Sequence, residues 1–207
     1  TDRKNNFHPR FLATIKPLKG LSLALSYSYE LVDEAIMRKP VLLEGWNFLT
    51  NQVTYTTKTK FNITNEDNKI ERYFNDAVLR YHHKFFKNSL TLDYMLGASQ
   101  ELYRAKNLHV TKQDMIDLGM SVLDGATGQA SANGGISEWA MRSVFSRLNL
   151  NWQDRYLLEF NLRADGSSRF LKNKRWGYFP SLSAAWRMDQ EKFMEGAFNG
   201  KLSNLKL

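Results

Sequence analysis

Histidines and acidic residues are the residues of this 207-residue chain that could bind a metal ion, and glycine-rich segments are those that could bind a phosphate. His82 and His83 are adjacent, so on a strand they point to opposite faces and cannot easily share a metal ion. The acidic segment 65–67 lacks the glycine that an EF-hand loop places at its sharp turn. The glycine-rich stretch 125–128 lacks the Gly-Lys-Ser/Thr ending of a phosphate-binding loop. These patterns predict neither a metal site nor a nucleotide cofactor.

Covalent and acid–base catalysis are disfavoured on the same grounds. The chain has no cysteine, which excludes thiol catalysis, disulfides and zinc–cysteine sites. Glu159 and Asp165 share one face of a predicted strand, but six residues of extended chain separate them by about 20 Å. That distance is too long for the paired carboxylates of a glycoside hydrolase. No nucleophile, histidine and acid form a recognisable set, and we predict that the chain is not an enzyme.

Polar residues that alternate with apolar ones along 138–152 and 156–165 form a more informative set. Period-2 alternation places them on one face of two neighbouring strands, where mixed charges could pair laterally and leave a hydrophilic wall. We interpret them first as structural anchors and second as contacts to a substrate. The candidates are Arg147, Asn149, Asn151, Glu159, Asn161, Arg163 and Asp165.

The elements that position this wall are predicted to be β-strands. The clearest is 21–30, where leucines and tyrosines occupy one face and small, mostly hydroxylated residues the other. Its length matches the ~9–11 residues of a tilted membrane strand, although a half-solvated soluble sheet has the same pattern. Strands are predicted at 10–16, 21–30, 71–84, 90–101, 138–152, 156–165 and 176–188, with another beginning at Leu205.

Short and long connections alternate between these strands. Turns are predicted at 17–20, 85–89 and 153–155, and long connections at 31–70, 104–137 and 166–175. This rhythm is typical of outer-membrane barrels, whose long loops are extracellular. Inside or after the long segments we expect a strand at 53–61, a turn at 65–68, helical turns at 111–118, a flexible stretch at 125–135 and a helical connection at 189–200.

Composition is compatible with a membrane barrel and argues against nucleic-acid binding. The net charge is +8, but the Lys and Arg residues are scattered and form no basic groove. No apolar run approaches the ~18 residues of a membrane helix, a criterion that does not apply to strands. Aromatic residues make up 13% of the chain, as expected for interfacial girdles or for the core of a soluble sandwich.

Five ordered blocks in the last third of the chain carry a family resemblance. They are Ser143–Asn149 (SVFSRLN), Asp154–Leu158 (DRYLL), Arg163–Phe170 (RADGSSRF), Arg175–Ser181 (RWGYFPS) and Ala185–Arg187 (AWR). Their wording and order resemble the SusC/RagA-like TonB-dependent transporters of the outer membrane of Gram-negative Bacteroidetes. The residues that match this pattern most closely are Arg147, Arg163, Asp165, Gly166, Ser167, Ser168, Arg169, Phe170, Trp176, Gly177, Phe179, Pro180 and Trp186.

The resemblance implies an all-β fold: about eight antiparallel strands of a larger transmembrane barrel of 22 strands, with long extracellular loops and short periplasmic turns. It further implies import of oligosaccharides or peptides with a SusD-like surface lipoprotein, energised through the TonB complex. The polar wall would then face the lumen and the plug domain held there. No cofactor is implied.

Residues 1–207 are accordingly expected to be part of a longer protein. The plug domain, the signal peptide and the remaining strands are not found in this sequence, and unpaired barrel edges would be costly in a bilayer. The alternative is a soluble or surface-attached β-rich binding or adhesive domain with no role in transport. A dry core between two sheets would favour that alternative, and a lipid-facing apolar band would favour the transporter.

Overall fold

The described residues form ten β-strands and four short 3₁₀ helices. The computed structural model describes residues 2–41, 43–56 and 61–194. The strands are β1 (Asp2–Phe7), β2 (Arg10–Leu18), β3 (Leu21–Arg38), β4 (Glu44–Asn47), β5 (Gln52–Thr56), β6 (Ile63–Phe85), β7 (Leu90–Lys112), β8 (Ala130–Trp152), β9 (Tyr156–Ser167) and β10 (Trp176–Trp186).

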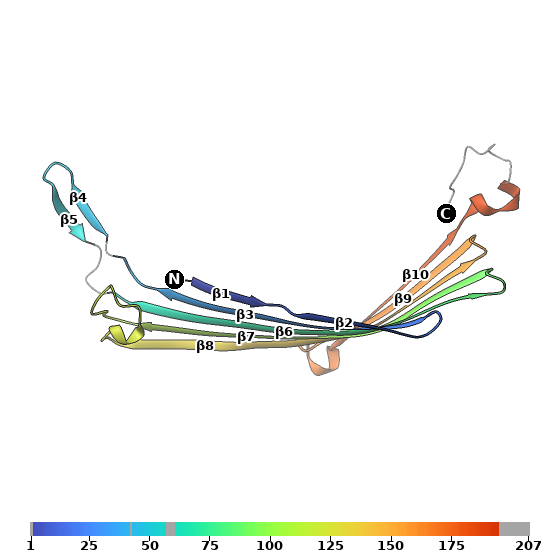
Figure 1. Cartoon of the computed structure of the whole chain (residues 1–207), viewed down its shortest axis with the longest axis horizontal. Helices are drawn as coiled ribbons and strands as arrows, with labels where there is room; N and C mark the ends of the chain where they lie inside the picture. The colour runs from blue at the N-terminus through green and yellow to red at the C-terminus, as the bar shows by residue number, and fades with distance from the viewer. Residues whose placement is uncertain (1, 42, 57–60, 195–207) are drawn as a thin grey trace. The chain divides into compact units, whose positions relative to one another are not determined.

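Eight of these strands form one antiparallel sheet (Figure 1). Its order is β1-β3-β6-β7-β8-β9-β10, and β2 also pairs with β3. The strands β4 and β5 pair with each other in a separate two-stranded sheet. The predicted all-β architecture of about eight antiparallel strands is therefore confirmed.

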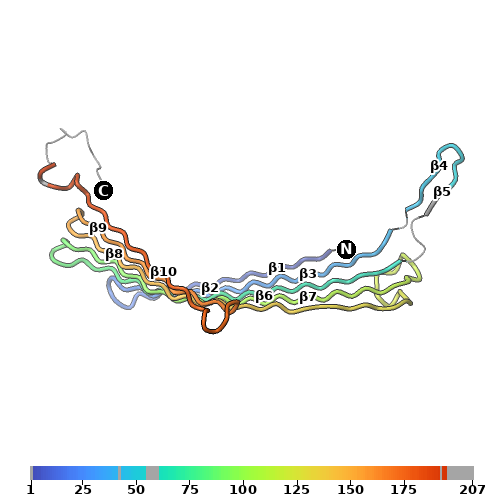
Figure 2. The backbone as a smooth tube through the Cα atoms, turned by 180° about the vertical axis from the view of Figure 1, so that it is seen from behind, coloured from blue at the N-terminus to red at the C-terminus, as the bar shows by residue number. Residues whose placement is uncertain are grey.

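The chain divides into two compact units. We call the first the loop unit; it comprises the described parts of 1–8, 30–72 and 103–138. The second, the turn unit, comprises 9–29, 73–102 and the described part of 139–207. Figure 2 shows β1 beside β3 in the loop unit, where Phe7 lies opposite Leu31 and Asp2 opposite Ile36.

The sheet of the turn unit has one apolar and one polar face. Large apolar side chains at alternate positions of β2, β3, β8, β9 and β10 remain exposed, for example Phe11, Tyr27, Leu158 and Phe160. Across the described residues only Ile63, Val78 and Ala126 are buried hydrophobic side chains. Among those residues there is thus no dry core between two sheets, which is the feature that the soluble alternative requires.

Short turns join the strands at one end of the turn unit. Gly20 adopts φ 82° in the β2–β3 turn, a conformation that favours glycine. Gln153 and Asp154 have φ 54° and 56° between β8 and β9, and Arg155 N–H donates to Trp152 O at 3.0 Å, as in a type I′ hairpin turn. The predicted alternation of short turns with longer connections is confirmed.

Several predicted boundaries were wrong. Strand β3 continues to Arg38, β6 begins at Ile63, β7 continues to Lys112 and β8 begins at Ala130. The expected turn at 65–68 lies within β6, and most of the flexible stretch expected at 125–135 belongs to β8. Charged residues interrupt the apolar period-2 signal in 31–38, 63–70 and 102–112. The β8 extension 130–137 consists of small and polar residues apart from Ile136, so it lacks that signal as well.

Smaller segments also differ from expectation. The strand expected at 53–61 is β5, which ends at Thr56 and pairs with β4. The 111–118 segment is not helical; the 3₁₀ helix η1 occupies Leu123–Gly125 instead. The 3₁₀ helices η3 (Met188–Gln190) and η4 (Lys192–Met194) cover the start of the connection expected at 189–200, and its remainder and the strand expected at Leu205 lie outside the described residues.

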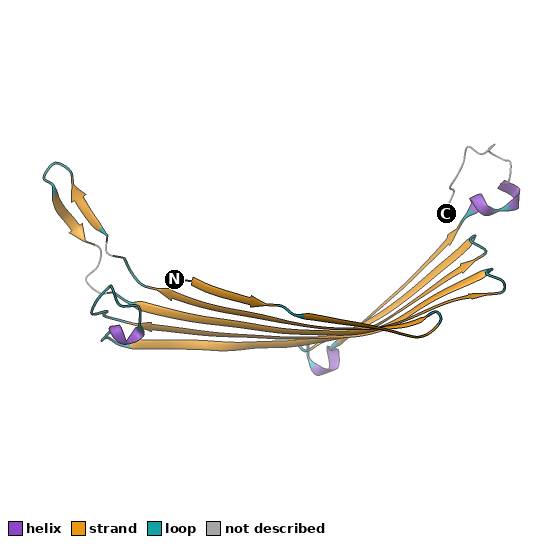
Figure 3. Cartoon of the chain, in the orientation of Figure 1, coloured by secondary structure: helices purple, strands orange, loops and turns teal. Residues whose placement is uncertain are grey.

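Helical structure is limited to short segments, as Figure 3 shows, including η2 (Lys172–Lys174) between β9 and β10. None of the helices in the described part of the chain has the length and apolar character needed to cross a membrane.

Candidate functional site

The polar wall predicted on β8 and β9 assembles on one face of the turn unit. The strands pair antiparallel, with Arg147 opposite Asn161 and Asn149 opposite Glu159. Strand β10 adds Ser181 opposite Asn161. The sequence therefore predicted the shared face correctly, while its lumenal orientation remains a prediction.

Amide groups connect the middle of this wall. The Nε of Arg147 donates to Asn161 Oδ1 at 2.7 Å, and Asn161 Nδ2 donates to Glu159 Oε1 at 2.7 Å. The same Nδ2 lies 3.3 Å from Ser181 Oγ. Asn161 thus links three strands, and the amide, rather than an ion pair, makes the lateral connection.

Arg163 is the centre of a second group of contacts. Its Nε lies 2.8 Å from both carboxylate oxygens of Asp165, on the same strand. Its Nη2 donates to Ser143 Oγ at 3.2 Å on β8. Its guanidinium also lies over the ring of Phe145, 5.7 Å from the centroid. The charges that were expected to pair across strands therefore pair along one strand here.

At the turn end, Asn151 stabilises the β8–β9 connection. Its Nδ2 donates to Asp154 Oδ1 at 2.6 Å. Its Oδ1 is buried and has no hydrogen-bond partner among the described residues. Asn149 accompanies it on the same face. An unpaired buried acceptor is costly, so this position is suited to a donor from elsewhere in the protein.

The serines of the RADGSSRF block extend the pairing of β8 and β9. Ser168 N–H donates to Ala140 O at 2.9 Å, and Ala140 N–H donates to Ser168 Oγ at 2.8 Å. Ser167 N–H donates to Arg175 O at 3.0 Å, and Arg175 Nε donates to Phe170 O at 3.1 Å. These hydrogen bonds hold the conformation of the loop between β9 and β10.

Two tryptophan rings pack against residues of the same loop, Trp176 against Gly166 and Trp139 against Arg169. A Cβ at Gly166 would lie 2.9 Å from Trp176 Cε2, so the small residue makes room for the indole. The guanidinium of Arg169 lies over the Trp139 ring, 4.9 Å from the centroid. Both contacts explain motif residues by packing, without a ligand.

Strand β10 carries the remaining motif residues. A Cβ at Gly177 would lie 2.9 Å from the Phe179 ring. Gly177 is opposite Asp165, and Phe179 is opposite Arg163. Pro180, which has no N–H to donate, lies opposite Leu162. Strand β10 therefore places the Phe179 ring beside the Arg163–Asp165 pair of β9.

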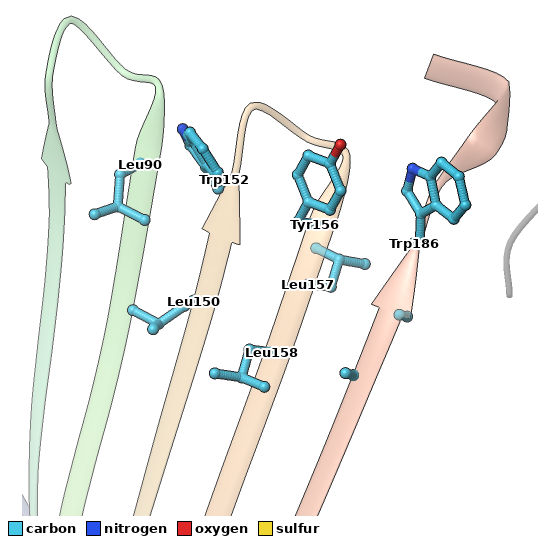
Figure 4. Close-up of a pocket in the computed structure, with 9 residues that line it drawn as sticks. Leu90, Leu150, Trp152, Tyr156, Leu157, Leu158 and Trp186 are labelled. Carbon is cyan, nitrogen blue, oxygen red and sulfur yellow. The ribbon is translucent and has the colours of Figure 1, made fainter. Parts of the chain in front are cut away.

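The apolar face of the turn unit ends in a belt of aromatic side chains (Figure 4). Trp152 and Tyr156 lie 5.6 Å apart between ring centroids, and Tyr156 and Trp186 lie 6.5 Å apart and stacked. With Leu90, Leu150 and neighbouring side chains they line a shallow apolar hollow of about 560 Å³. Such a belt is typical of strands that end at a membrane interface.

Glu191 fastens the following segment to this belt. Its Oε1 accepts hydrogen bonds from Tyr156 Oη at 2.7 Å and Trp186 Nε1 at 3.1 Å, and its Oε2 lies 3.4 Å from Arg155 Nη1. The Tyr156 hydroxyl, followed by the Trp186 indole, lowers the pKa of the Glu191 carboxyl below its usual value. Sequence reasoning missed this contact because nothing in the spacing of 155, 156, 186 and 191 predicts it.

The loop unit has a polar face of its own, on strands that were expected to be loops. Arg38 Nε lies 3.3 Å from Glu66 Oε1, and His109 Nδ1 lies 3.6 Å from the same atom. His109 Nε2 lies 3.2 Å from Thr111 Oγ1, which is 2.8 Å from Thr64 Oγ1. These contacts join β3, β6 and β7 through alternate residues, so they lie on one face.

Nearer to the turn unit along the strands, this face carries a further ion pair. Arg72 Nη1 lies 3.2 Å from Glu30 Oε2, and its guanidinium lies over Tyr103, 5.6 Å from the ring centroid. Asn68 Nδ2 lies 3.4 Å from Glu34 Oε2 between the two groups. The sequence prediction missed these wall residues because it treated their strands as connections.

The chemistry of both polar faces is that of binding. In the described residues no three His, Asp or Glu side chains gather into a metal-binding group. His82 contacts Asp93 and His83 contacts Tyr81 and Phe85, which confirms that the two histidines face opposite sides. Both faces offer hydrogen-bonding and charged groups.

Comparisons with known proteins agree with this geometry. Residues 2–196 match the family model described as "TonB dependent receptor-like, beta-barrel". The TonB-dependent receptor SusC of Bacteroides thetaiotaomicron is 49% identical over 65 residues, which cover 31% of this chain and 6% of SusC. TonB-dependent receptor P3 of Formosa agariphila is 22% identical over 198 residues, which cover 93% of this chain and 18% of that receptor.

Solved structures show the same fold. The RagAB peptide transporter aligns with a TM-score of 0.84 and 17% identity over 99% of this chain and 22% of the matched chain. The RagAB peptide importer in its "open-open" state aligns with a TM-score of 0.80 and 18% identity over 94% and 20%. The chain thus spans between 6% and 22% of the length of these proteins.

Proposed function

The chain belongs to the TonB-dependent receptor-like β-barrel family, and we propose that it forms part of the barrel wall of an importer in the outer membrane of a Gram-negative bacterium. Members of this family are outer-membrane transporters rather than enzymes. The SusC/RagA-like resemblance of the sequence is confirmed by the SusC match. Transport by the whole protein, its substrate and its partners are the subject of the proposal.

The observation that carries the proposal is the two-faced sheet of the turn unit. An apolar face that ends in Trp152, Tyr156 and Trp186 is suited to lipid. The opposite face presents the Arg147–Asn161–Glu159 and Arg163–Asp165 groups, which are suited to a wet lumen. A soluble sandwich would bury one face of this sheet, and the described residues contain no second layer that does so.

We assign different tasks to the two polar faces. The wall of the turn unit would anchor a plug domain, and the unpaired Oδ1 of Asn151 supports this role. The polar face of the loop unit would contact the substrate, which is an oligosaccharide or a peptide. A SusD-like surface lipoprotein would cover the extracellular mouth, and the TonB complex would supply energy through the plug.

Fractionation and uptake test this proposal with the full-length protein. If the chain is part of a transporter, the full-length protein should be extracted from the outer membrane by detergent, have a mass much larger than 24.1 kDa and co-purify with a surface lipoprotein. Uptake of a labelled oligosaccharide or peptide should require TonB. Recovery of the protein in the detergent-free soluble fraction, or uptake unchanged by deletion of TonB, would contradict the proposal.

A further inference from the structure

The polar face of the loop unit contains a hollow that the family assignment does not explain. Its volume is about 420 Å³. The small side chains of Ala105 on β7 and of Gly135 and Ser137 on β8 leave its floor open. Glu34 and Asn68 line one side, and Asn107 another. We call this feature the amide hollow.

Contacts place Glu34, Asn68 and Asn107 on one face, whereas Lys69, Lys106 and Ile136 alternate with the other lining residues and point to the opposite face. Asn68 Nδ2 lies 3.4 Å from Glu34 Oε2. A Cβ built on Gly135 would lie 3.3 Å from Asn107 Oδ1, so a larger residue at 135 would enter the same space as the Asn107 amide. Asn107 alternates along β7 with His109, which contacts Glu66 on this face. The hollow therefore belongs to the face that carries the ion pairs described above.

Glu34 is more loosely paired than Glu30 and Glu66, the other two carboxylates in the contacts described above. Glu30 Oε2 lies 3.2 Å from Arg72 Nη1, and Glu66 Oε1 lies 3.3 Å from Arg38 Nε. Glu34 Oε1 lies 4.0 Å from Lys4 Nζ, and its side chain is 31% exposed. Because an ion pair at this distance on an exposed side chain is weak, a cation at hydrogen-bond distance would compete well for the carboxylate.

The chemistry of the lining favours a peptide over a sugar. Two carboxamides each offer a donor and an acceptor, which match the C=O and N–H of a peptide backbone. The apolar side chains of the lining are aliphatic, as Ile70 is, so within the described residues the hollow offers no aromatic ring for the flat apolar side of a sugar. The weakly paired carboxylate of Glu34 is suited to an ammonium group.

Resting on the proposed import function, we propose that the amide hollow binds the amino end of an oligopeptide. Glu34 accepts hydrogen bonds from the terminal ammonium, and Asn68 and Asn107 pair with the first peptide groups. The floor of small residues allows the peptide backbone to approach the sheet. Selection of a free amino end is the specificity that this arrangement produces.

The test uses the full-length transporter with its co-purifying partners in detergent. The probe is a library of hexapeptides, offered with free or acetylated amino ends, and retained peptides are counted by mass spectrometry. The wild type should retain free-amine peptides about tenfold better, the effect of one hydrogen bond to a charged group. Glu34→Gln, which keeps the side-chain shape, should remove this preference.

Glu138→Gln is the matched control. Like Glu34, Glu138 is paired with a basic side chain: its Oε1 lies 3.0 Å from Arg104 Nε. Because Glu138 directly follows Ser137 on β8, its side chain lies on the opposite face. This variant should keep the tenfold preference. A wild type without preference, a preference retained in Glu34→Gln, or retention of maltohexaose in place of peptides would each overturn the inference.

TonB-dependent uptake, measured in the same strains, distinguishes the two proposals. Uptake that needs TonB but is the same for free and acetylated peptides would overturn the amide hollow and leave the transporter assignment intact. Uptake that does not need TonB would overturn the proposed function itself.

Discussion

Replacement of Gly97 should destabilise the polar wall through a single aromatic ring. An ideal Cβ at position 97 would overlap the ring of Phe145, with Phe145 Cδ2 at 3.0 Å. The ring also lies under the guanidinium of Arg163 and so cannot move without disturbing the contacts of that arginine to Ser143. Forced overpacking costs about 1–3 kcal/mol. We expect Gly97→Ala to lower the free energy of unfolding by that amount.

Two further variants give this prediction its control. Gly135→Ala also replaces a strand glycine on a polar face, but its Cβ meets only the end of the Asn107 side chain at 3.3 Å. Because alanine restricts the unfolded chain, this change should be neutral or stabilise by up to about 1 kcal/mol. In a Phe145→Ala background, Gly97→Ala should no longer lower the free energy of unfolding, because the ring that its Cβ would overlap is gone.

The measurement is urea unfolding of the full-length barrel in detergent, followed by tryptophan fluorescence and by gel mobility of unheated samples. The two probes must agree before free energies are compared. A cost for Gly97→Ala below about 0.5 kcal/mol, or one that persists without the Phe145 ring, would refute the assignment of this glycine to ring packing.

Three other changes probe the remaining contacts. Gly135→Val should fill the amide hollow and reduce hexapeptide retention about tenfold, while the amount of protein in the outer membrane stays unchanged; undiminished retention would contradict the hollow as the binding site. Glu191→Gln should weaken the link to Tyr156 and increase trypsin cleavage after Arg187. In the wild type, the lowered pKa of Glu191 means that the link to Tyr156 is fully present above the ordinary carboxyl pKa of 4.5 and is lost as the pH falls below that value. Pepsin cleavage of this segment should therefore rise with acidity. Equal cleavage at pH 3 and pH 5, after correction for pepsin activity, would count against the link. Arg163→Lys keeps the charge but loses the simultaneous contacts of one side chain to Asp165 and Ser143, and since this arginine is half exposed we expect a loss below about 1 kcal/mol in the same urea titration.

The turn unit was predictable from sequence because apolar and polar side chains alternate along its strands. Strands such as 21–30 and 156–165 must alternate apolar and polar residues, and this period was visible without any tertiary information. The shared face of Arg147, Asn161 and Glu159 followed directly from the same rule. What did not follow was the pairing within the face, because hydrogen-bond partners depend on register and rotamer.

The strand extensions in the loop unit were not predictable in this way. In 31–38 and 63–70 both faces carry charged residues, and in 102–112 one face mixes leucine and valine with arginine and lysine, so hydrophobic periodicity is weak. These residues are strands because their neighbours supply backbone partners, which is information held in the sheet and not in any one segment. The amide hollow was missed for the same reason, since it needs small residues on β7 and β8 beside polar ones on β3 and β6.

This difference affects where specificity can reside. Side chains on a paired sheet lose little further freedom when a ligand binds, whereas a flexible loop must be ordered at a cost in conformational entropy. A binding surface on β3, β6, β7 and β8 is therefore better organised in advance than the irregular connection 113–129 could be. Alternate residues of these strands can also change without loss of backbone pairing. Substitutions at 34, 68 and 107 should therefore alter which peptides are retained while the fold is preserved.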